Sequence, residues 1–426
     1  MELVTSELDV LFSALTRLDL KLESALKFIQ DKSSGYISTY PYQGLLISED
    51  QSRDALKRLP GAPLFAVDDV PGQSRISDLL EPGTRLSQLQ QIYQLTPFDM
   101  EVLLLALAPE LDRRYEQIYA CLQDHAGRRW PSIDLALNLF CANAVERIRR
   151  RVHFSSDAPL FKHGVMRLVP ESDQAVSSLL EQSLKLDEFI THFLLCQDEL
   201  DRRLASFCTL FAGAEALDHG AGGEGLVRAL SALMRAARLA GEPLRLYLRG
   251  ADGAANAACA RAVAAAIDVP LLAVNLHEVV APGGDASDRM ALVWRYAYLY
   301  DVVLFLDGVD VVREAQPAGD FDRWLNPLAD YPGSVVLSGQ QPWPPATRRA
   351  LGVLTLTVDK PGFAERRAGW QGQLAAYTHA LSDADLDGLA DRFQLTQTQI
   401  AEASMVAHRV SKLRASREGE AEPRLV

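Results

Sequence analysis

The segment from Gly250 to Ala257 has the spacing of a phosphate-binding loop but lacks most of the groups that hold phosphate. Such a loop needs glycines so that the backbone can curl, a lysine for the β- and γ-phosphates, and a hydroxyl for Mg²⁺. Gly250 and Gly253 keep their places after the apolar stretch LRLYLR, whereas Asn256 replaces the lysine and Ala257 the hydroxyl. Each charge-assisted hydrogen bond contributes about 1.5 to 3 kcal/mol, so these losses predict affinity weaker by roughly two to four orders of magnitude.

Two further positions of this segment oppose phosphate binding. Ala255 stands where a third glycine belongs, and Asp252 places a negative charge beside the expected phosphates. We therefore expect no firmly bound cofactor, and ATP or ADP with Mg²⁺ would bind weakly.

A second motif, VVLFLD, ends in Asp307, at the position where an aspartate holds Mg²⁺ beside a bound nucleotide. An ordinary carboxylate that ends a strand and begins a turn explains Asp307 equally well. The next residue, where an acidic group would activate water, is Gly308. Because glycine cannot act as a base, the sequence predicts no catalytic residue here.

Three polar residues follow the later apolar strand around Val335. Gln340 stands where a polar side chain can sense the γ-phosphate. Arg348 and Arg349 are candidates for an arginine finger that serves a neighbouring subunit, although a pair of surface arginines fits the pattern equally well. We assign no metal site.

The surrounding sequence predicts the elements that position these residues. From Leu244 onward, short apolar strands alternate with helices, which favours a parallel sheet covered by helices. From Phe363 to about Val410 the pattern is purely helical, and we expect a small helical lid. Its expected apolar set is Leu381, Leu386, Leu389, Ala390, Phe393, Leu395 and Ile400.

The N-terminal part is predicted to be mainly helical. Leucines recur at three- and four-residue steps from Leu8 to Ile29 along one seam of a helix, and we favour packing within its own domain over a coiled coil. Three or four helices follow between residues 85 and 141, with Thr96 and Pro97 starting one of them.

The sequence after these helices predicts two short strands and a further helix in the first domain. Residues 160–169 resemble two strands that turn at His163 and Gly164, which together with the helices indicates a winged-helix domain. A long amphipathic helix is expected over residues 172–211. The arginine cluster of residues 147–151 could meet DNA phosphates, but a solvated helix face is the preferred interpretation.

Composition limits the range of functions. The chain has 426 residues and a net charge of −13, which opposes nonspecific binding of nucleic acid. Its five cysteines form no CxxC pair, so we interpret them as buried thiols. No signal peptide and no long apolar run are present in the sequence, so we expect a cytoplasmic protein without a membrane partner.

The order of these motifs resembles a known family. The stretches LTPFDMEVLLLALAPELDRRYEQIYACLQD, GADGAANAACARAVAAAIDVPLL, LFLDGVD and RFQLTQTQIAEA are similar to the N-terminal half of the winged-helix AAA+ ATPases that accompany bacterial contractile injection systems. The resemblance covers nearly the whole chain, and residues 95–124 are its most specific part. It implies a decayed first ATPase module, with hydrolysis supplied by an intact second module.

Together these observations predict a multidomain α and α/β fold. The expected divisions are an amphipathic helix (1–35), a winged-helix-like domain (36–212), a degenerate AAA+ P-loop domain (213–360), a helical lid (361–413) and a linker or tail (414–426). We expect a non-hydrolysing scaffold that recruits a protein target, as part of a homo-oligomeric ring or beside an active AAA+ module. The alternatives are a weakly active ATPase and a DNA-binding winged-helix regulator.

Overall fold

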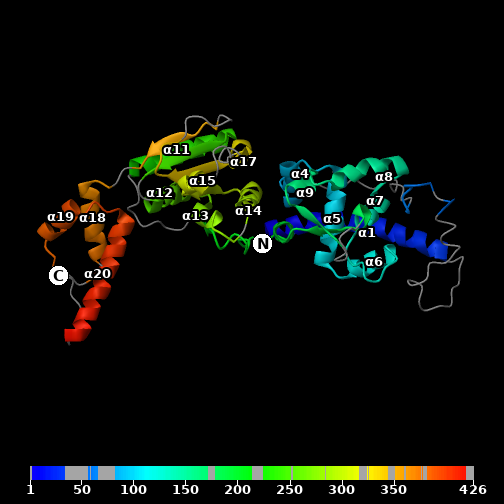
Figure 1. The fold of residues 1–426 in the computed structure, drawn as a ribbon, viewed down its shortest axis with the longest axis horizontal. Coiled ribbons are helices and arrows are strands. Elements are labelled where there is room, and N and C mark those ends of the chain that lie inside the picture. Colours follow the sequence, from blue (N-terminus) through cyan, green and yellow to red (C-terminus); the bar gives the residue numbers. More distant parts are fainter. Residues whose placement is uncertain are drawn as a thin grey trace. The chain divides into compact units, whose positions relative to one another are not determined.

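The computed structural model describes most of the chain, which divides into two compact units, Met1–Glu199 and Leu200–Val426 (Figure 1). The division lies at residues 199 and 200, whereas the sequence placed the domain boundary at residue 212. The described residues are 2–33, 56–57, 59–65, 82–170, 178–213, 224–250, 253–283, 285–315, 324, 326–343, 351–358, 361–375, 377 and 381–418.

The first unit is mostly helical. Its elements are α1 (Glu2–Ser33), α4 (Arg85–Tyr93), α5 (Pro97–Leu111), α6 (Arg114–Leu122), α7 (Ile133–Phe140), α8 (Ala144–Arg150), η1 (Arg151–Phe154), α9 (Pro159–Lys162), β1 (Met166–Val169), η2 (Leu179–Glu181), β2 (Ser183–Leu186) and α10 (Glu188–Leu194).

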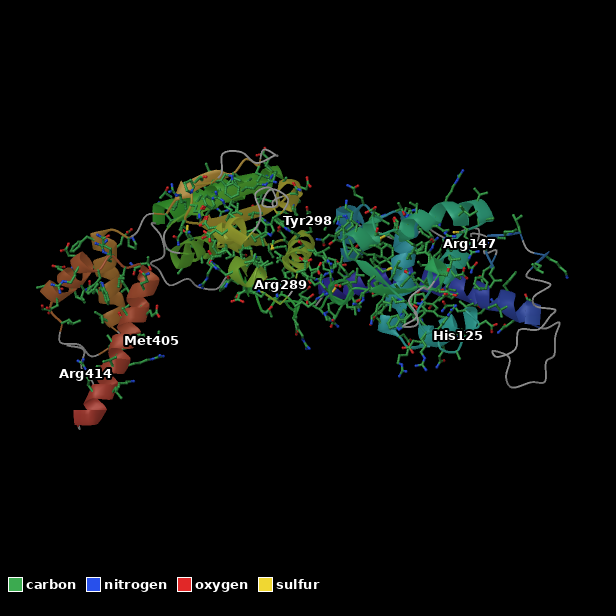
Figure 2. All side chains as sticks on the ribbon, in the orientation of Figure 1. His125, Arg147, Arg289, Tyr298, Met405 and Arg414 are labelled. Atoms are coloured by element: carbon green, nitrogen blue, oxygen red, sulfur yellow. The ribbon has the colours of Figure 1, made fainter. Side chains whose placement is uncertain are left out.

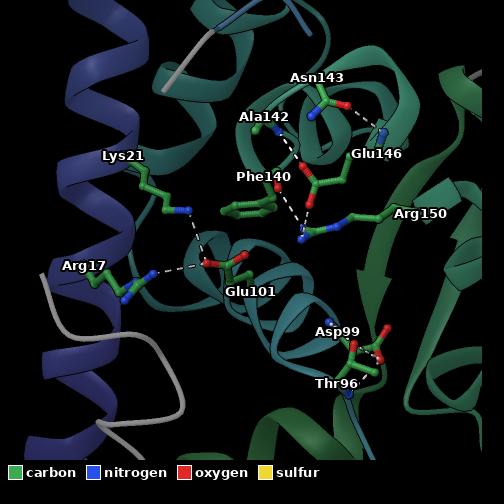
Figure 3. A network of polar contacts seen from close by, with 10 residues as sticks. All are labelled: Arg17, Lys21, Thr96, Asp99, Glu101, Phe140, Ala142, Asn143, Glu146 and Arg150. Atoms are coloured by element: carbon green, nitrogen blue, oxygen red, sulfur yellow. Dashed lines mark hydrogen bonds and ion pairs between the residues drawn. The ribbon is translucent and has the colours of Figure 1, made fainter. Parts of the chain in front are cut away.

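Helix α1 packs within its own unit, as the leucine seam predicted. Leu15, Leu18 and Leu22 are all less than a tenth exposed, and α1 lies against α5, α6 and α7. Both Arg17 and Lys21 reach the Glu101 carboxylate of α5, at 3.5 and 3.2 Å (Figure 3). These contacts lie beside the buried apolar seam, which carries most of the packing of α1 on its own unit.

Helix α5 is the centre of the first unit. It begins where the sequence predicted, because Thr96 accepts a hydrogen bond from the Asp99 amide and the Asp99 carboxylate accepts one from the Thr96 amide. Pro97 occupies the first turn, where no amide donor is needed. Asp99 is 1% exposed whereas Thr96 is exposed, so only the carboxylate side of this capping box is buried.

The predicted hairpin exists, but with other strands. Residues 159–162 form α9 instead of the first strand, and β1 pairs antiparallel with β2, Met166 facing Leu186. The prediction of one long helix over residues 172–211 was wrong, because that stretch contains β2, α10 and a strand of the second unit. The polar turns around these short elements interrupt the apolar periodicity on which that prediction rested.

The second unit contains an α/β sheet and a group of C-terminal helices. Its elements are β3 (Cys208–Phe211), α11 (Glu224–Ala240), β4 (Leu244–Arg249), α12 (Gly253–Ala266), β5 (Leu271–Asn275), α13 (Leu276–Val279), α14 (Ala286–Leu299), β6 (Val303–Asp307), α15 (Val309–Ala315), α17 (Asn326–Asp330), β7 (Ser334–Gly339), β8 (Leu354–Thr357), α18 (Phe363–Leu374), α19 (Asp383–Arg392) and α20 (Gln397–Glu418).

The six-stranded sheet has the order β3-β5-β6-β7-β4-β8. All neighbours pair in parallel except the edge strand β3, which runs antiparallel to β5 with Phe211 opposite Leu271. On one face Leu246, Phe305 and residues of α11 and α12 share a buried core. Tyr247 and Arg245 point to the opposite face, because successive side chains of a strand alternate. There Arg245 donates to the carbonyls of Leu328 and Ala329 around α17. The predicted parallel sheet covered by helices is therefore confirmed.

The C-terminal helices form a small core of their own. Trp370, Leu374, Leu386, Ala390 and Ile400 are buried together, which confirms the predicted helical character of this region. Two expectations differ from the structure. Phe393, assigned to the apolar set, is 44% exposed, and α20 continues to Glu418, through residues assigned to a linker.

Two predictions made from composition, buried cysteines and the absence of a membrane span, can be compared with the structure. Cys141, Cys208 and Cys259 are buried, and burial raises their thiol pKa values to about 11, about 12 and about 11. Cys121 is exposed, so the expectation of buried thiols was wrong for this residue. No helix within the described ranges is long and apolar enough to cross a bilayer.

Candidate functional site

The predicted site residues lie at one edge of the parallel sheet. Strands β4, β6 and β7 are adjacent and parallel, so their carboxyl ends meet. These ends carry Gly250, Asp307 and Gln340 respectively. In open α/β sheets this edge is where ligands bind. The structure therefore brings together the residues that the two motifs and the third strand predicted.

Asn256, which stands in the lysine position, is turned into the protein. Its side chain is 1% exposed, and its Nδ2 donates to the Leu248 carbonyl at 3.2 Å and to Ser338 Oγ at 2.9 Å. The amide thus joins the start of α12 to both β4 and β7. A phosphate-binding lysine would extend its ammonium group toward solvent and ligand, whereas this side chain serves the packing of the sheet edge.

Asn256 also has a buried acceptor. Its Oδ1 has no hydrogen-bond partner among the described residues. It lies close to the backbone of Gly250, since a Cβ built on that glycine would be 2.9 Å away. Gly250 is therefore required for the close approach of the amide, independently of any phosphate.

Asp307 lies beside the first residue of α12. A Cβ built on Gly253 would be 3.4 and 3.5 Å from its two carboxylate oxygens. This is the place that an aspartate with a Mg²⁺ role would occupy. A carboxylate there also stabilises a helix N-terminus by roughly 0.3 to 1 kcal/mol without any ligand, so Asp307 has a structural role in the protein as it stands.

Two features of the structure restrict position 308 to glycine. Its φ is +82°, a conformation that side chains rarely adopt, and its amide donates to the Ser338 carbonyl at 3.2 Å. A Cβ at this position would lie 2.9 Å from both Cδ2 and Nε2 of His277. The imidazole thus fills the space into which an activating carboxylate would extend. The local backbone is shaped for glycine.

The end of β7 is held by other protein groups. The Asp310 carboxylate of α15 accepts hydrogen bonds from the amides of Gln340 and Gln341. Tyr247 donates its hydroxyl to the Gln341 carbonyl at 2.6 Å, and burial followed by the charge of Asp310 raises its pKa to about 12. The backbone around Gln340 is therefore fixed by α15 and β4.

A cavity of about 320 Å³ opens next to this edge. It lies between β3, β5 and α12, and both Ala257 and Asp307 line it. Arg261 lines it as well, with its guanidinium 4.4 Å from the centre of the Phe211 ring. With Ala257 in place of a hydroxyl, the α12 side of the cavity offers no oxygen ligand for a metal at that position.

Several groups at this edge were not found from the sequence. Ser338 and Asp310 each bond to a predicted site residue, and His277 lies beside Gly308. All three come from other elements whose positions depend on tertiary packing. Ala251, Asp252, Arg348 and Arg349 lie outside the described residues. In the part of the chain that the structure describes, no group of three His, Cys, Asp or Glu side chains could hold a metal ion.

Comparisons with known proteins support a winged-helix domain in the N-terminal part of the chain. The family described as "Winged helix domain, variant" matches residues 73–208. Among solved structures, the chain is similar to the crystal structure of the FIGL-1 AAA domain, with a TM-score of 0.43 and 15% identity over 54% of this chain and 88% of that chain. A search of curated proteins gave no match. The family match confirms the winged-helix domain, and the use of the sheet edge for nucleotide stays a prediction.

Proposed function

We propose that this chain is a non-hydrolysing AAA-type module with a winged-helix region, which acts as a scaffold and partner-recruiting part of an ATP-driven assembly machine. The observation that carries the proposal is the inward position of Asn256, bonded to β4 and β7. The group that should hold phosphate holds the sheet edge together instead. His277 occupies the space of the water-activating acid beside Gly308, which further supports an inactive module.

The finer part of the proposal comes from the sequence resemblance. It implies, as part of this proposal, that the chain works with contractile injection systems beside an AAA+ module whose phosphate loop is complete. The parallel sheet, in which the strands bearing Gly250, Asp307 and Gln340 are neighbours, supports an AAA-type domain. In this arrangement the chain contributes contacts to the assembly and its partner contributes hydrolysis.

Repair of the phosphate loop tests the proposal. Ala255→Gly, Asn256→Lys and Ala257→Thr together restore the third glycine, the cation and the hydroxyl. The triple variant should bind ATP about tenfold more tightly or better in calorimetry, because charge-assisted hydrogen bonds are regained. It should still release no phosphate above background, since no base is present.

Two outcomes would refute the proposal. If the triple variant binds ATP no better than the parent, the loop is not a decayed phosphate loop. If the unchanged chain releases phosphate in a Mg²⁺-dependent reaction that Asp307→Ala abolishes, the chain is an ATPase. A matched control is Ala264→Gly in the same helix, a residue that faces the buried core and should leave ATP binding unchanged.

A further inference from the structure

The winged-helix unit exposes a stripe of aliphatic side chains. Val145, Ile148 and Val152 are 59%, 62% and 66% exposed, on α8 and the following turn η1. Their spacing of three and four residues places them on one side of the helix. By contrast, the aliphatic residues of α5 from Val102 to Leu107 are all buried.

The arginines of the same segment fall into two pairs. Arg147 forms an ion pair with Asp134. Arg150 bonds to the Phe140 carbonyl at 2.8 Å and to Glu146 (Figure 3). Both therefore serve the fold.

The other pair has a different environment. Arg149 and Arg151 are exposed, and neither makes an ion pair with any residue in the described ranges. Helical spacing puts these two arginines on opposite sides of the aliphatic row. We use the name "α8 stripe" for Val145, Ile148 and Val152 with Arg149 and Arg151 (Figure 2 labels Arg147 on the same helix).

The α8 stripe lies where a winged-helix domain presents its recognition helix. Helices α7 and α8 follow each other through a short turn, and the β1–β2 hairpin comes after them. In helix-turn-helix proteins the second helix faces the ligand. This surface is therefore the one that the fold displays.

Its chemistry does not suit DNA. Base edges are read by polar side chains, and the phosphate backbone is bound by many lysines and arginines. Here the outward row is aliphatic, two of the four arginines are engaged in the fold, and the whole chain carries a net charge of −13.

We propose that the α8 stripe is a docking site for an acidic amphipathic helix of a partner protein. Exposed aliphatic residues at helical spacing fit the apolar face of such a helix, in the helix-on-helix mode of recognition. Arg149 and Arg151 on the two sides would pair with carboxylates at the edges of that face, which fixes its orientation. The assignment deepens the recruiting part of the proposed function and does not require the α/β unit to be inactive.

The test uses the full chain and a designed peptide. The probe is a fluorescent helix of about 20 residues, roughly 30 Å long, with leucines along one face and glutamates elsewhere. Anisotropy should show saturable binding, which Ile148→Ser with Val152→Ser weakens about tenfold or more. Arg149→Glu with Arg151→Glu should also weaken binding, and should create binding of the matching peptide that carries lysines in place of the glutamates.

Two controls test whether the peptide binds specifically to the α8 stripe. Leu239→Ser with Arg228→Glu removes an exposed leucine and an exposed arginine from α11 of the other unit, and it should leave binding unchanged. A peptide of the same composition with scrambled order should not bind. Unfolding by urea checks that each variant is folded.

Three results would overturn the proposal. The first is absence of peptide binding, and the second is binding that the α8 variants do not change. The third is binding of duplex DNA that falls steeply with salt and is lost in Arg149→Glu with Arg151→Glu but kept in Ile148→Ser with Val152→Ser. None of these results depends on ATP hydrolysis, so they leave the test of the phosphate loop unaffected.

Discussion

The sheet edge of the second unit and the α8 stripe of the first unit use their polar groups in opposite ways. At the sheet edge, Asn256 and Asp310 bond to neighbouring strands and turns. On α8, Arg149 and Arg151 stand exposed beside aliphatic side chains. The sheet edge has the spacing of a phosphate-binding motif but its polar groups bond within the protein, whereas the stripe lacks a motif but exposes aliphatic and basic side chains.

The difference shows that the spacing of a motif does not determine which contacts its side chains make in the folded protein. Spacing alone placed Asn256, Asp307 and Gln340 at a common edge. It could not show that the amide faces inward, because that depends on Ser338, a residue far away in the sequence. The comparison predicts that substitutions at the sheet edge reduce stability and that substitutions on the α8 stripe do not.

The largest effect is expected at Gly308. Gly308→Glu should lower the free energy of unfolding of the second unit by about 3 kcal/mol or more. Left-handed backbone costs a side chain about 1 to 2 kcal/mol, and displacement of the His277 ring adds to it. Urea unfolding measures the loss.

A matched glycine separates the two causes. Gly352 has a φ of +61° and nothing within 4 Å of its built Cβ, so Gly352→Glu should carry only the backbone cost. His277→Ala in the Gly308→Glu background should recover the steric part. If Gly308→Glu is as stable as the parent, the imidazole does not occupy the space assigned to it.

The next effect is expected at Asn256. Asn256→Leu should cost about 1 to 3 kcal/mol, because it leaves the buried Leu248 carbonyl and Ser338 hydroxyl without their donor. Ser338→Ala should cost less, since only one bond is lost. A double-mutant cycle should give a coupling energy of about 0.5 kcal/mol or more. Strict additivity would show that the amide and the hydroxyl do not interact.

The sequence predicted the architecture better than it predicted the local environment. The α1 seam, the Thr96 cap and the parallel sheet follow from periodicity and local capping signals, and all were confirmed. The prediction of one helix over residues 172–211 was wrong because β2 and β3, which lie in this stretch, form by pairing with the separate strands β1 and β5. The same limit applies to the site, where His277 comes from helix α13 and Ser338 from strand β7.

A smaller, pH-dependent effect is expected at the cap of α5, where the Asp99 carboxylate is buried. Burial raises the pKa of Asp99, but hydrogen bonds from His153 and Thr96 outweigh this and lower it below 3.8. A lowered pKa in the folded state means that the contribution is complete above the unfolded value of about 3.9 and is lost as pH falls through the folded value. Asp99→Asn should therefore cost about 1 to 2 kcal/mol near neutral pH. The difference in stability from the parent should begin to shrink below about pH 4 and close only below the folded pKa of Asp99.

The C-terminal helices offer a matched control for this cap. Asp385 forms the same capping box with Ser382 at the start of α19, but in an exposed position, and its hydrogen bonds to Ser382 also lower its pKa. Asp385→Asn should cost less than Asp99→Asn. Urea unfolding at several pH values compares the two, and equal costs would show that burial does not strengthen the Asp99 cap.

The smallest effect on stability is expected on the α8 stripe. Arg149→Glu with Arg151→Glu should change the free energy of unfolding of the first unit by less than about 0.5 kcal/mol, because no described residue pairs with either arginine. The neighbouring Arg147→Glu is the contrasting variant. It removes the ion pair with Asp134, in which the arginine side chain is only 14% exposed, and places two carboxylates together. Arg147→Glu should therefore cost clearly more, about 1 to 3 kcal/mol. If Arg149→Glu with Arg151→Glu destabilises the unit as much as Arg147→Glu does, these two arginines stabilise the fold. The contrast between the inward-facing polar groups of the sheet edge and the outward-facing arginines of the α8 stripe would then be wrong.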